Sequence, residues 1–133
     1  MSPTRKDPFP AWYAALESRH LEDLKFSEVR RALEALSSIY VQRRGAIRKG
    51  AALDSGGKRA AFALFYGPLH YLAVRHVLEQ LKPLKPYPKR IIDIGCGTGA
   101  AGAAWAVHAG GKPSVRGYDL HPWAVKEAGW TLG

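Results

Sequence analysis

Apolar side chains recur at intervals of three and four residues in the first third of the chain. The recurring positions are Phe26, Val29, Leu33, Leu36 and Tyr40. This spacing places them on one stripe of an α-helix, for which Ser27 is a suitable N-cap. The pattern therefore predicts a helix that begins at Ser27 and ends near Gly45, preceded by a shorter helix that starts near Pro10.

The middle of the chain contains a second helical region. Residues 60–66 are alanine-rich and aromatic, and Gly67-Pro68 should interrupt them, because the residue before a proline avoids helical geometry. Pro68 suits the first turn of a new helix. That helix is apolar on most of its surface, which predicts that it is buried. Three prolines within residues 82–89 predict a linker.

The pattern changes after the linker. Residues 91–94 form a short, nearly all-apolar run that is typical of a buried parallel strand. A glycine turn follows at 95–99, then an alanine-rich helix pattern at 100–108, a second strand at 114–118, and a third element that opens at Pro122. Strand, glycine turn, helix, strand is the order of a βαβ mononucleotide-binding unit.

The sequence thus predicts an α/β fold in three parts. Residues 1–82 form a helical N-terminal region, residues 83–88 a proline-rich linker, and residues 89–133 the first half of a Rossmann-like sheet. A total of 133 residues is one domain's worth of protein, and 47% hydrophobic residues is close to the globular average.

Composition excludes several classes of protein. No apolar run approaches the length of a membrane-spanning helix, and the charged N-terminus has no apolar core of a secretory signal behind it. A single cysteine excludes a disulfide framework and a cysteine-based zinc site, and the five histidines have no metal-ligand spacing. We expect a cytoplasmic protein that has no bound metal and no contact with a membrane.

The net charge of +9 is confined to the middle of the chain. Residues 35–92 hold eleven bases and two acids, whereas the two flanking regions are neutral. We name six of these bases the basic belt: Arg43, Arg44, Arg48, Lys49, Lys58 and Arg59. The linker adds Lys82, Lys85, Lys89 and Arg90. A solvated surface is the ordinary explanation of such a run. The confinement of the excess positive charge to residues 35–92 favours contacts with the phosphates of a structured RNA.

The glycine turn carries the clearest chemistry. Glycines at alternate positions let the chain turn sharply out of a strand and let a ligand approach the backbone. The next helix then points its N-terminal amides at the ligand, and an acid at the end of the second strand, here Asp119, accepts hydrogen bonds from ribose hydroxyls. Two registers compete. A dinucleotide pattern, GxGxxG, starts at Gly97, whereas the pattern DxGxGxG starts at Asp93. The strand ends at Ile94, which favours Gly95 as the first glycine and disfavours an NAD-dependent oxidoreductase.

In this register, residues 91–99 resemble the first motif of class I S-adenosylmethionine-dependent methyltransferases, and Tyr118-Asp119 resembles the second. The resemblance implies that the turn lies along the methionine part of the cofactor, with Asp93 near the amino end and Asp119 at the ribose. The implied contacts to S-adenosylmethionine or S-adenosylhomocysteine are Asp93, Gly95, Cys96, Gly97, Thr98, Gly99, Asp119 and Leu120.

A narrower resemblance covers more of the chain. Residues 66–78 and the segment 36–40 are similar to the Rsm22-like methyltransferases of the small ribosomal subunit, which implies association with ribosomal RNA. The iron–sulfur cysteines of some members of that family are not present. No catalytic residue is predicted, because the substrate-contacting motif of the family would lie beyond Gly133.

These features suggest a truncated enzyme whose incomplete sheet is covered by the N-terminal helices or by a second copy. The alternative is a non-catalytic RNA-binding or ribosome-assembly module that retains the fold.

Overall fold

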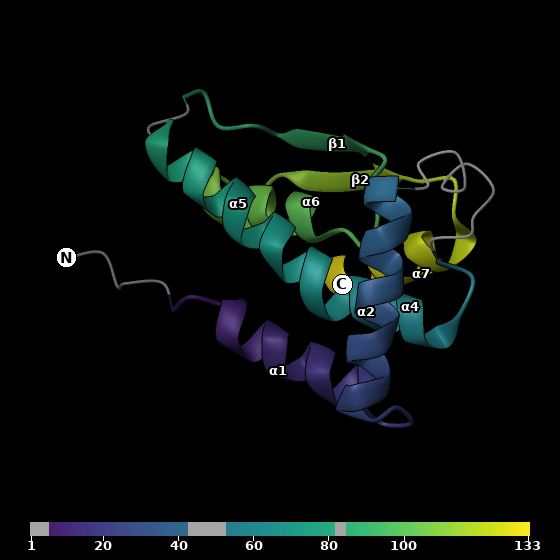
Figure 1. Cartoon of the computed structure of the whole chain (residues 1–133). Helices are drawn as coiled ribbons and strands as arrows, with labels where there is room; N and C mark the ends of the chain where they lie inside the picture. Colours follow the sequence, from purple (N-terminus) through teal and green to yellow (C-terminus); the bar gives the residue numbers. More distant parts are fainter. Residues whose placement is uncertain (1–5, 43–52, 82–84) are drawn as a thin grey trace. The chain divides into compact units, whose positions relative to one another are not determined.

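The computed structural model describes residues 6–42, 53–81 and 85–133 and contains both helices and a parallel sheet (Figure 1). The chain divides into two compact units, residues 1–64 and 65–133. In the described residues no helix has the length and apolar character needed to span a membrane.

The first unit is helical. It contains α1 (Phe9–His20), α2 (Phe26–Gln42) and α4 (Gly56–Ala61). Helices α2 and α4 pack closely, and a Cβ placed on Gly57 would lie 3.1 Å from Cβ of Ala32. Val29, Leu36 and Ile39 are buried. Of the predicted stripe, Val29 and Leu36 are thus buried and Leu33 and Tyr40 are half-buried, whereas Ile39 is buried although the predicted stripe did not include it.

Two details of α2 correct the sequence prediction. Ser27 is inside the helix and is not its N-cap, because the helix begins one residue earlier. The Glu28 carboxylate instead accepts a hydrogen bond from the Lys25 backbone amide at 2.7 Å, which satisfies an amide before the first turn. Phe26 was predicted as part of the buried stripe but is 72% exposed. The predicted end of this helix at residues 43–45 lies outside the described residues.

The break predicted at Gly67-Pro68 is not observed, because the chain is helical from Gly56 to Gln80 and only widens into a π-helical turn just before Gly67. Ser55 caps α4 by accepting a hydrogen bond from the Lys58 backbone amide at 3.2 Å. The chain then continues through η2 (Phe62–Tyr66) into α5 (Gly67–Gln80). Proline has no backbone N–H and its ring crowds the preceding turn, and the wider π-helical turn accommodates both effects. Pro68 stands in the first turn of α5, as predicted.

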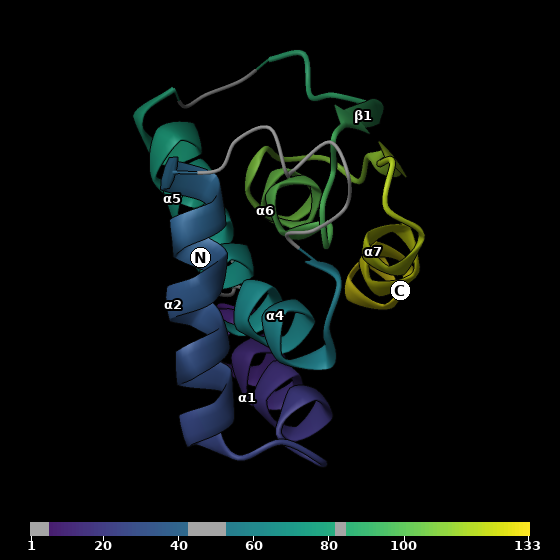
Figure 2. The same cartoon turned by 45° about the vertical axis from the view of Figure 1, so that its right-hand side comes forward.

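The second unit contains the predicted strand–helix–strand order. It consists of α5, β1 (Arg90–Ile94), α6 (Ala100–His108), β2 (Ser114–Tyr118) and α7 (Pro122–Leu132). The two strands are parallel, with Arg90 opposite Ser114 and Ile94 opposite Tyr118. Helix α6 contacts both strands, α5 packs on α6, and α7 lies against β2 and α6. Figure 2 shows α6 between α5 and α7, below β1.

The pairing of α5 with α6 changes two expectations. The phenolic oxygen of Tyr71 lies 2.9 Å from Nε2 of His108, which joins the two helices through a buried tyrosine. Helix α5 therefore belongs with the sheet, and the compact units divide near residue 65 instead of at the proline-rich residues 83–88. Helix α5 is also only partly buried, since Leu69 and Val77 are 46% and 51% exposed.

One face of the sheet has no covering layer among the described residues. Alternate side chains of β1 and β2 point to opposite faces, and Ile91 and Val115 lie toward α6. On the other face Ile92, Ile94 and Tyr118 are 57%, 77% and 49% exposed. The helices of the second unit thus lie on one side of a two-stranded sheet.

Candidate functional site

The parallel register brings the two predicted motifs to the same edge of the sheet. Ile94 and Tyr118 are paired, so the glycine turn and Asp119 leave the sheet side by side. The carbonyl oxygen of Tyr118 accepts hydrogen bonds from the backbone amides of Gly95 and Cys96, at 2.7 and 2.9 Å. The end of β2 therefore anchors the start of the turn that follows β1.

The turn itself has a backbone that requires glycine. Gly95, Gly97 and Gly99 have φ angles of 71°, 53° and 84°, in the left-handed region that other residues rarely adopt. Gly99 also lies close to α7, because a Cβ placed on it would be 3.1 Å from Cα and Cβ of Ala128. The three alternate glycines thus shape the turn and keep its surface free of side chains.

Asp119 braces this turn with both of its carboxylate oxygens. Its Oδ2 accepts a hydrogen bond from the Gly97 amide at 2.9 Å, and its Oδ1 accepts one from the His121 amide at 2.9 Å. The first bond joins the two motifs, and the second satisfies an amide at the start of α7. Each carboxylate oxygen retains further acceptor capacity, so Asp119 can accept additional hydrogen bonds from a ligand.

Asp93 lies below the turn on the side of the sheet that faces α6. Its Oδ2 is buried and has no hydrogen-bond partner among the described residues. Burial raises the pKa of the Asp93 carboxyl, the Gly102 backbone amide opposes this shift, and the Asp119 carboxylate adds to it. Two carboxylates therefore lie close enough to interact at this edge of the sheet, which favours a ligand with a cationic group.

Cys96 and Thr98 are the buried residues of the turn, at 8% and 5% exposure. Burial raises the pKa of the Cys96 thiol, and the carboxylates of Asp119 and Asp93 raise it further. The Cys96 thiol therefore ionises less readily than an exposed cysteine, consistent with a packing role. Leu120, by contrast, is fully exposed next to Asp119.

Helix α6 begins directly after the turn, at Ala100, and Gly99 provides no side-chain cap for its first amides. The Gly99 amide donates to the Cys96 carbonyl oxygen at 2.9 Å, and the Ala103 amide donates to the Gly99 carbonyl oxygen at 2.9 Å. The positive end of the helix dipole thus points to the turn, where an anionic group is stabilised.

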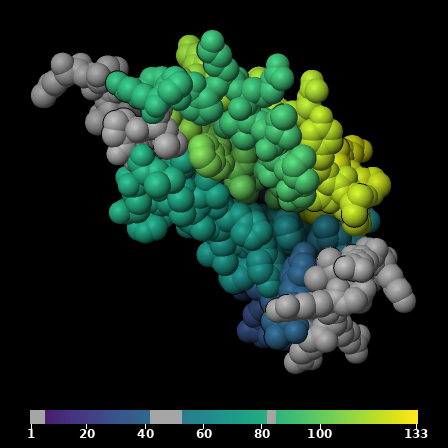
Figure 3. Space-filling model, turned by 90° about the horizontal axis from the view of Figure 1, so that it is seen from above, coloured from purple at the N-terminus to yellow at the C-terminus, as the bar shows by residue number. Residues whose placement is uncertain are grey.

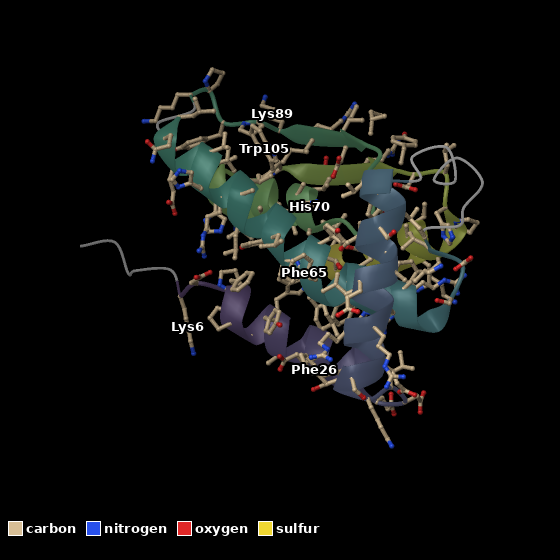
Figure 4. The ribbon with its side chains drawn as sticks, viewed as in Figure 1. Lys6, Phe26, Phe65, His70, Lys89 and Trp105 are labelled. Atoms are coloured by element: carbon tan, nitrogen blue, oxygen red, sulfur yellow. The ribbon has the colours of Figure 1, made fainter. Side chains whose placement is uncertain are left out.

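Two small residues that sequence reasoning missed are needed for this packing. A Cβ placed on Gly117 would lie 2.8 Å from Sγ of Cys96, and one placed on Gly102 would lie 3.3 Å from Oδ2 of Asp93. A hollow of about 350 Å³ adjoins Asp93 along the edge of β1 and extends to Trp105 on α6. Figure 4 labels Trp105. A glycine inside the strand Ser114–Tyr118 is the only sequence signal for the first of these contacts.

The basic belt is described only in part. Arg43, Arg44, Arg48 and Lys49 lie outside the described residues. Lys58 and Arg59 are on α4, where Nζ of Lys58 pairs with the Asp54 carboxylate at 3.0 Å and Nε of Arg59 donates to the Leu53 carbonyl oxygen at 3.0 Å. In the part of the chain that the structure covers, no group of three metal-ligating side chains occurs.

Comparison with protein-family models, with curated proteins and with solved structures finds no match to this chain.

Proposed function

We propose that this chain is the cofactor-binding portion of an S-adenosylmethionine-dependent methyltransferase that acts on RNA. The observation that carries the proposal is the hydrogen bond between Asp119 and the Gly97 amide, which joins the acid after β2 to the glycine turn after β1. In that arrangement Asp119, the backbone of the glycine turn and the N-terminus of α6 adjoin one another, which supports a site for the ribose and amino-acid parts of the cofactor.

The residues present fit the cofactor chemically. Asp119 retains acceptor capacity for two ribose hydroxyls, and the Asp93 carboxylate suits an ammonium group. The amides at the start of α6 suit the carboxylate of an amino acid. The cofactor supplies an activated methyl group when it is bound. The residues of this chain hold and orient it: the turn provides a backbone surface, and Asp119 fixes the distance between the two motifs.

The register of the glycines supports this cofactor over a dinucleotide. Gly95 is the first residue after β1, and its amide is already bonded to Tyr118 of β2. Gly97, which would be the first glycine of a dinucleotide pattern, is instead three residues beyond the end of β1, and its amide donates a hydrogen bond to Asp119. A pyrophosphate would therefore meet a carboxylate at the position where a dinucleotide-binding turn offers an amide.

The test is a calorimetric titration of the chain with S-adenosylhomocysteine and, separately, with NAD. We expect weak but saturable binding of S-adenosylhomocysteine and no methyl transfer by this chain alone. Saturable binding of NAD without binding of S-adenosylhomocysteine would overturn the proposal.

RNA is the proposed methyl acceptor because of the uneven charge, with eleven bases and two acids in residues 35–92. The alternative function, a non-catalytic RNA-binding or ribosome-assembly module, uses the same surface. The observation in its favour is that the described sheet has two strands, so its exposed face offers Ile92 and Ile94 for assembly with a partner or a second copy.

A quadruple variant tests the contribution of the basic belt. Replacement of Arg43, Arg44, Arg48 and Lys49 by alanine should weaken binding to a structured RNA and flatten its salt dependence, since each phosphate contact contributes about 0.9 to the slope on duplex. A variant that loses the exposed cations Lys6, Lys25, Arg30 and Arg31 has the same net charge and is the control. Equal loss of affinity in both variants would exclude the belt as a site.

A further inference from the structure

Tyr87, on the segment that precedes β1, packs against the turn after α6 and remains half exposed. A Cβ placed on Gly110 would lie 2.5 Å from Cε1 of Tyr87, and one placed on Gly111 would lie 3.0 Å from its Cβ. The tyrosine thus lies directly on the turn that follows α6. Its side chain is nonetheless 49% exposed.

The turn that supports Tyr87 requires glycine for two reasons. Gly110 and Gly111 have φ angles of 89° and 71°, which is left-handed backbone, and any side chain at Gly110 would displace the ring. The ring is therefore positioned by backbone and does not depend on flexible side chains. A preorganised aromatic surface loses little conformational entropy when a flat partner stacks on it.

Four cations lie on the segments next to this ring. Nζ of Lys85 lies over it at 6.0 Å from the ring centroid, and Lys89 and Arg90 follow at the start of β1. The Lys89 carbonyl oxygen accepts a hydrogen bond from the Ser114 amide at 3.0 Å, which brings Lys112, two residues before Ser114, to the same end of the sheet. All four cationic side chains are exposed. We name this set the Tyr87 platform: Lys85, Tyr87, Lys89, Arg90 and Lys112.

Three of the four acids of the second unit lie elsewhere, since Asp93 and Asp119 are at the opposite, carboxyl end of the strands and Glu127 is buried in α7. Glu79 is in the last turn of α5, six residues before Lys85, so the four cations outnumber the one acid on the neighbouring segments. The Tyr87 platform is therefore a cationic surface at the amino end of the sheet. In Figure 4, Lys89 is labelled at the start of β1, and in Figure 3 the green atoms of the residues around β1 form part of the outer surface.

We propose that the Tyr87 platform binds single-stranded nucleic acid, with a base stacked on Tyr87 and phosphates on the neighbouring lysines and Arg90. Cations alone would suit any polyanion, but the fixed exposed ring adds a surface that stacks on a base of any identity. Base stacking with backbone contacts is the usual mode of sequence-tolerant binding to single strands. This inference deepens the RNA part of the proposed function and rests on it.

The test is fluorescence anisotropy of the 133-residue chain with labelled ten-nucleotide oligo(U), oligo(dT) and an RNA hairpin. We expect the wild-type chain to bind oligo(U). Tyr87→Leu should raise the Kd about ten-fold, the order expected for the loss of one stacked base. Tyr87→Phe keeps an aromatic ring and should change the Kd less than about two-fold. Tyr118→Leu is the matched control, since Tyr118 has the same 49% exposure in the same unit. Oligo(dT) should respond to Tyr87→Leu as oligo(U) does, because stacking and phosphate contacts do not involve the 2′-hydroxyl.

The charges are tested separately. Replacement of Lys85, Lys89 and Lys112 by alanine should lower the slope of log K against log salt by about 2, at roughly 0.7 for each single-strand phosphate contact. Replacement of the exposed lysines Lys6, Lys25 and Lys126 should leave the slope unchanged. The proposal is overturned if Tyr87→Leu binds oligo(U) as the wild type does, if Tyr118→Leu loses as much affinity, or if only the hairpin binds.

A parallel titration with S-adenosylhomocysteine separates this proposal from the proposed function. Tyr87→Leu should bind S-adenosylhomocysteine as the wild type does, because the ring lies at the other end of the strands from the glycine turn. If the cofactor binds and oligo(U) binding does not depend on Tyr87, the platform is wrong and the cofactor assignment stands. Retained melting temperature in the variants shows that the fold is intact.

Discussion

The carboxylate of Asp119 accepts a hydrogen bond from the Gly97 backbone amide across the ends of two parallel strands, at 2.9 Å. The two residues are 22 positions apart in sequence, and the bond fixes the glycine turn before any ligand binds. Because the other oxygen of the same carboxylate holds the His121 amide, Asp119 also orients the start of α7. The Asp119 side chain thus holds both the glycine turn that follows β1 and the start of the helix that follows β2.

We expect Asp119→Ala to lower the free energy of unfolding by about 2 kcal/mol or more, because two backbone amides lose a charged acceptor. Urea denaturation followed by circular dichroism measures the change. Asp54→Ala is the control, since Asp54 is in an exposed pair with Lys58 whose loss should cost less than about 1 kcal/mol. Equal effects of the two substitutions would show that the Asp119 bonds do not brace the turn.

Gly99→Ala and Gly129→Ala should change stability in opposite directions. An alanine at position 99 has an unfavourable left-handed backbone and meets Ala128 at 3.1 Å, so we expect a loss of about 1–3 kcal/mol. Gly129 is inside α7 with no atom within 4 Å of a new Cβ, so alanine there should stabilise by up to about 1 kcal/mol. Thermal denaturation of both variants checks the signs, and a stabilising Gly99→Ala would contradict the turn geometry.

Gly117→Ala should be destabilising because of one neighbour. The new Cβ would lie 2.8 Å from Sγ and 2.9 Å from Cβ of Cys96, a clash that we expect to cost about 1–3 kcal/mol. Cys96→Gly removes both clashing atoms, so the double variant should lose less stability than the sum of the two single variants. A double-mutant cycle by urea denaturation measures this coupling, and additive effects would show that β2 and the turn do not pack as described.

Asp93→Asn should raise the melting temperature at neutral pH and have no such effect in acid. The pKa of Asp93 is raised above its usual value of 3.8 chiefly by burial, so the folded state disfavours the ionised carboxyl. The resulting loss of stability is absent below pH 3.8, grows as the pH rises above that value, and is complete above the raised folded-state pKa.

The difference in melting temperature between Asp93→Asn and the wild type, measured from pH 3 to pH 8, tests this sign, with Asp54→Asn as the control for a simple change of net charge. A difference that is independent of pH, or largest in acid, would contradict the raised pKa. Asp93→Asn should also bind S-adenosylhomocysteine more weakly, because the Asp93 carboxylate that lowers the stability of the fold is the group that we propose for the ammonium group of the cofactor.

The second half of the fold was predictable because several local signals agree there. The β-branched run before Gly95, the alternate glycines and the stop at Gly110 mark the ends of β1, α6 and β2 within one residue of their observed positions. Left-handed backbone at Gly95, Gly97 and Gly99 is the physical reason for this pattern. The strand–helix–strand order predicts that the two strands are parallel. Because parallel strands end at the same edge of a sheet, Asp93 and Asp119 are expected to lie close together, as they do.

The first half was less predictable because its tertiary contacts override local patterns. The proline-rich residues 83–88 indicate a boundary, yet α5 packs on α6 through Tyr71 and His108, two residues whose pairing has no signal in the sequence. Phe26 fits the helical period of α2 but lies at its first turn, where its side chain is mostly exposed. Gly117 and Tyr87 gain their roles only from residues brought close by the fold, Cys96 and the Gly110-Gly111 turn.

The affinity of S-adenosylhomocysteine for the wild type and for Asp119→Asn, measured by calorimetry with Asp54→Asn as the control, tests the central claim most directly. Asparagine keeps one acceptor for the Gly97 amide but loses the charge and half of the capacity to hold two hydroxyls. We predict saturable binding to the wild type and to Asp54→Asn, and at least a ten-fold weaker Kd for Asp119→Asn. Equal heats for the wild type and Asp119→Asn, or tighter binding of NAD than of S-adenosylhomocysteine, would contradict the account.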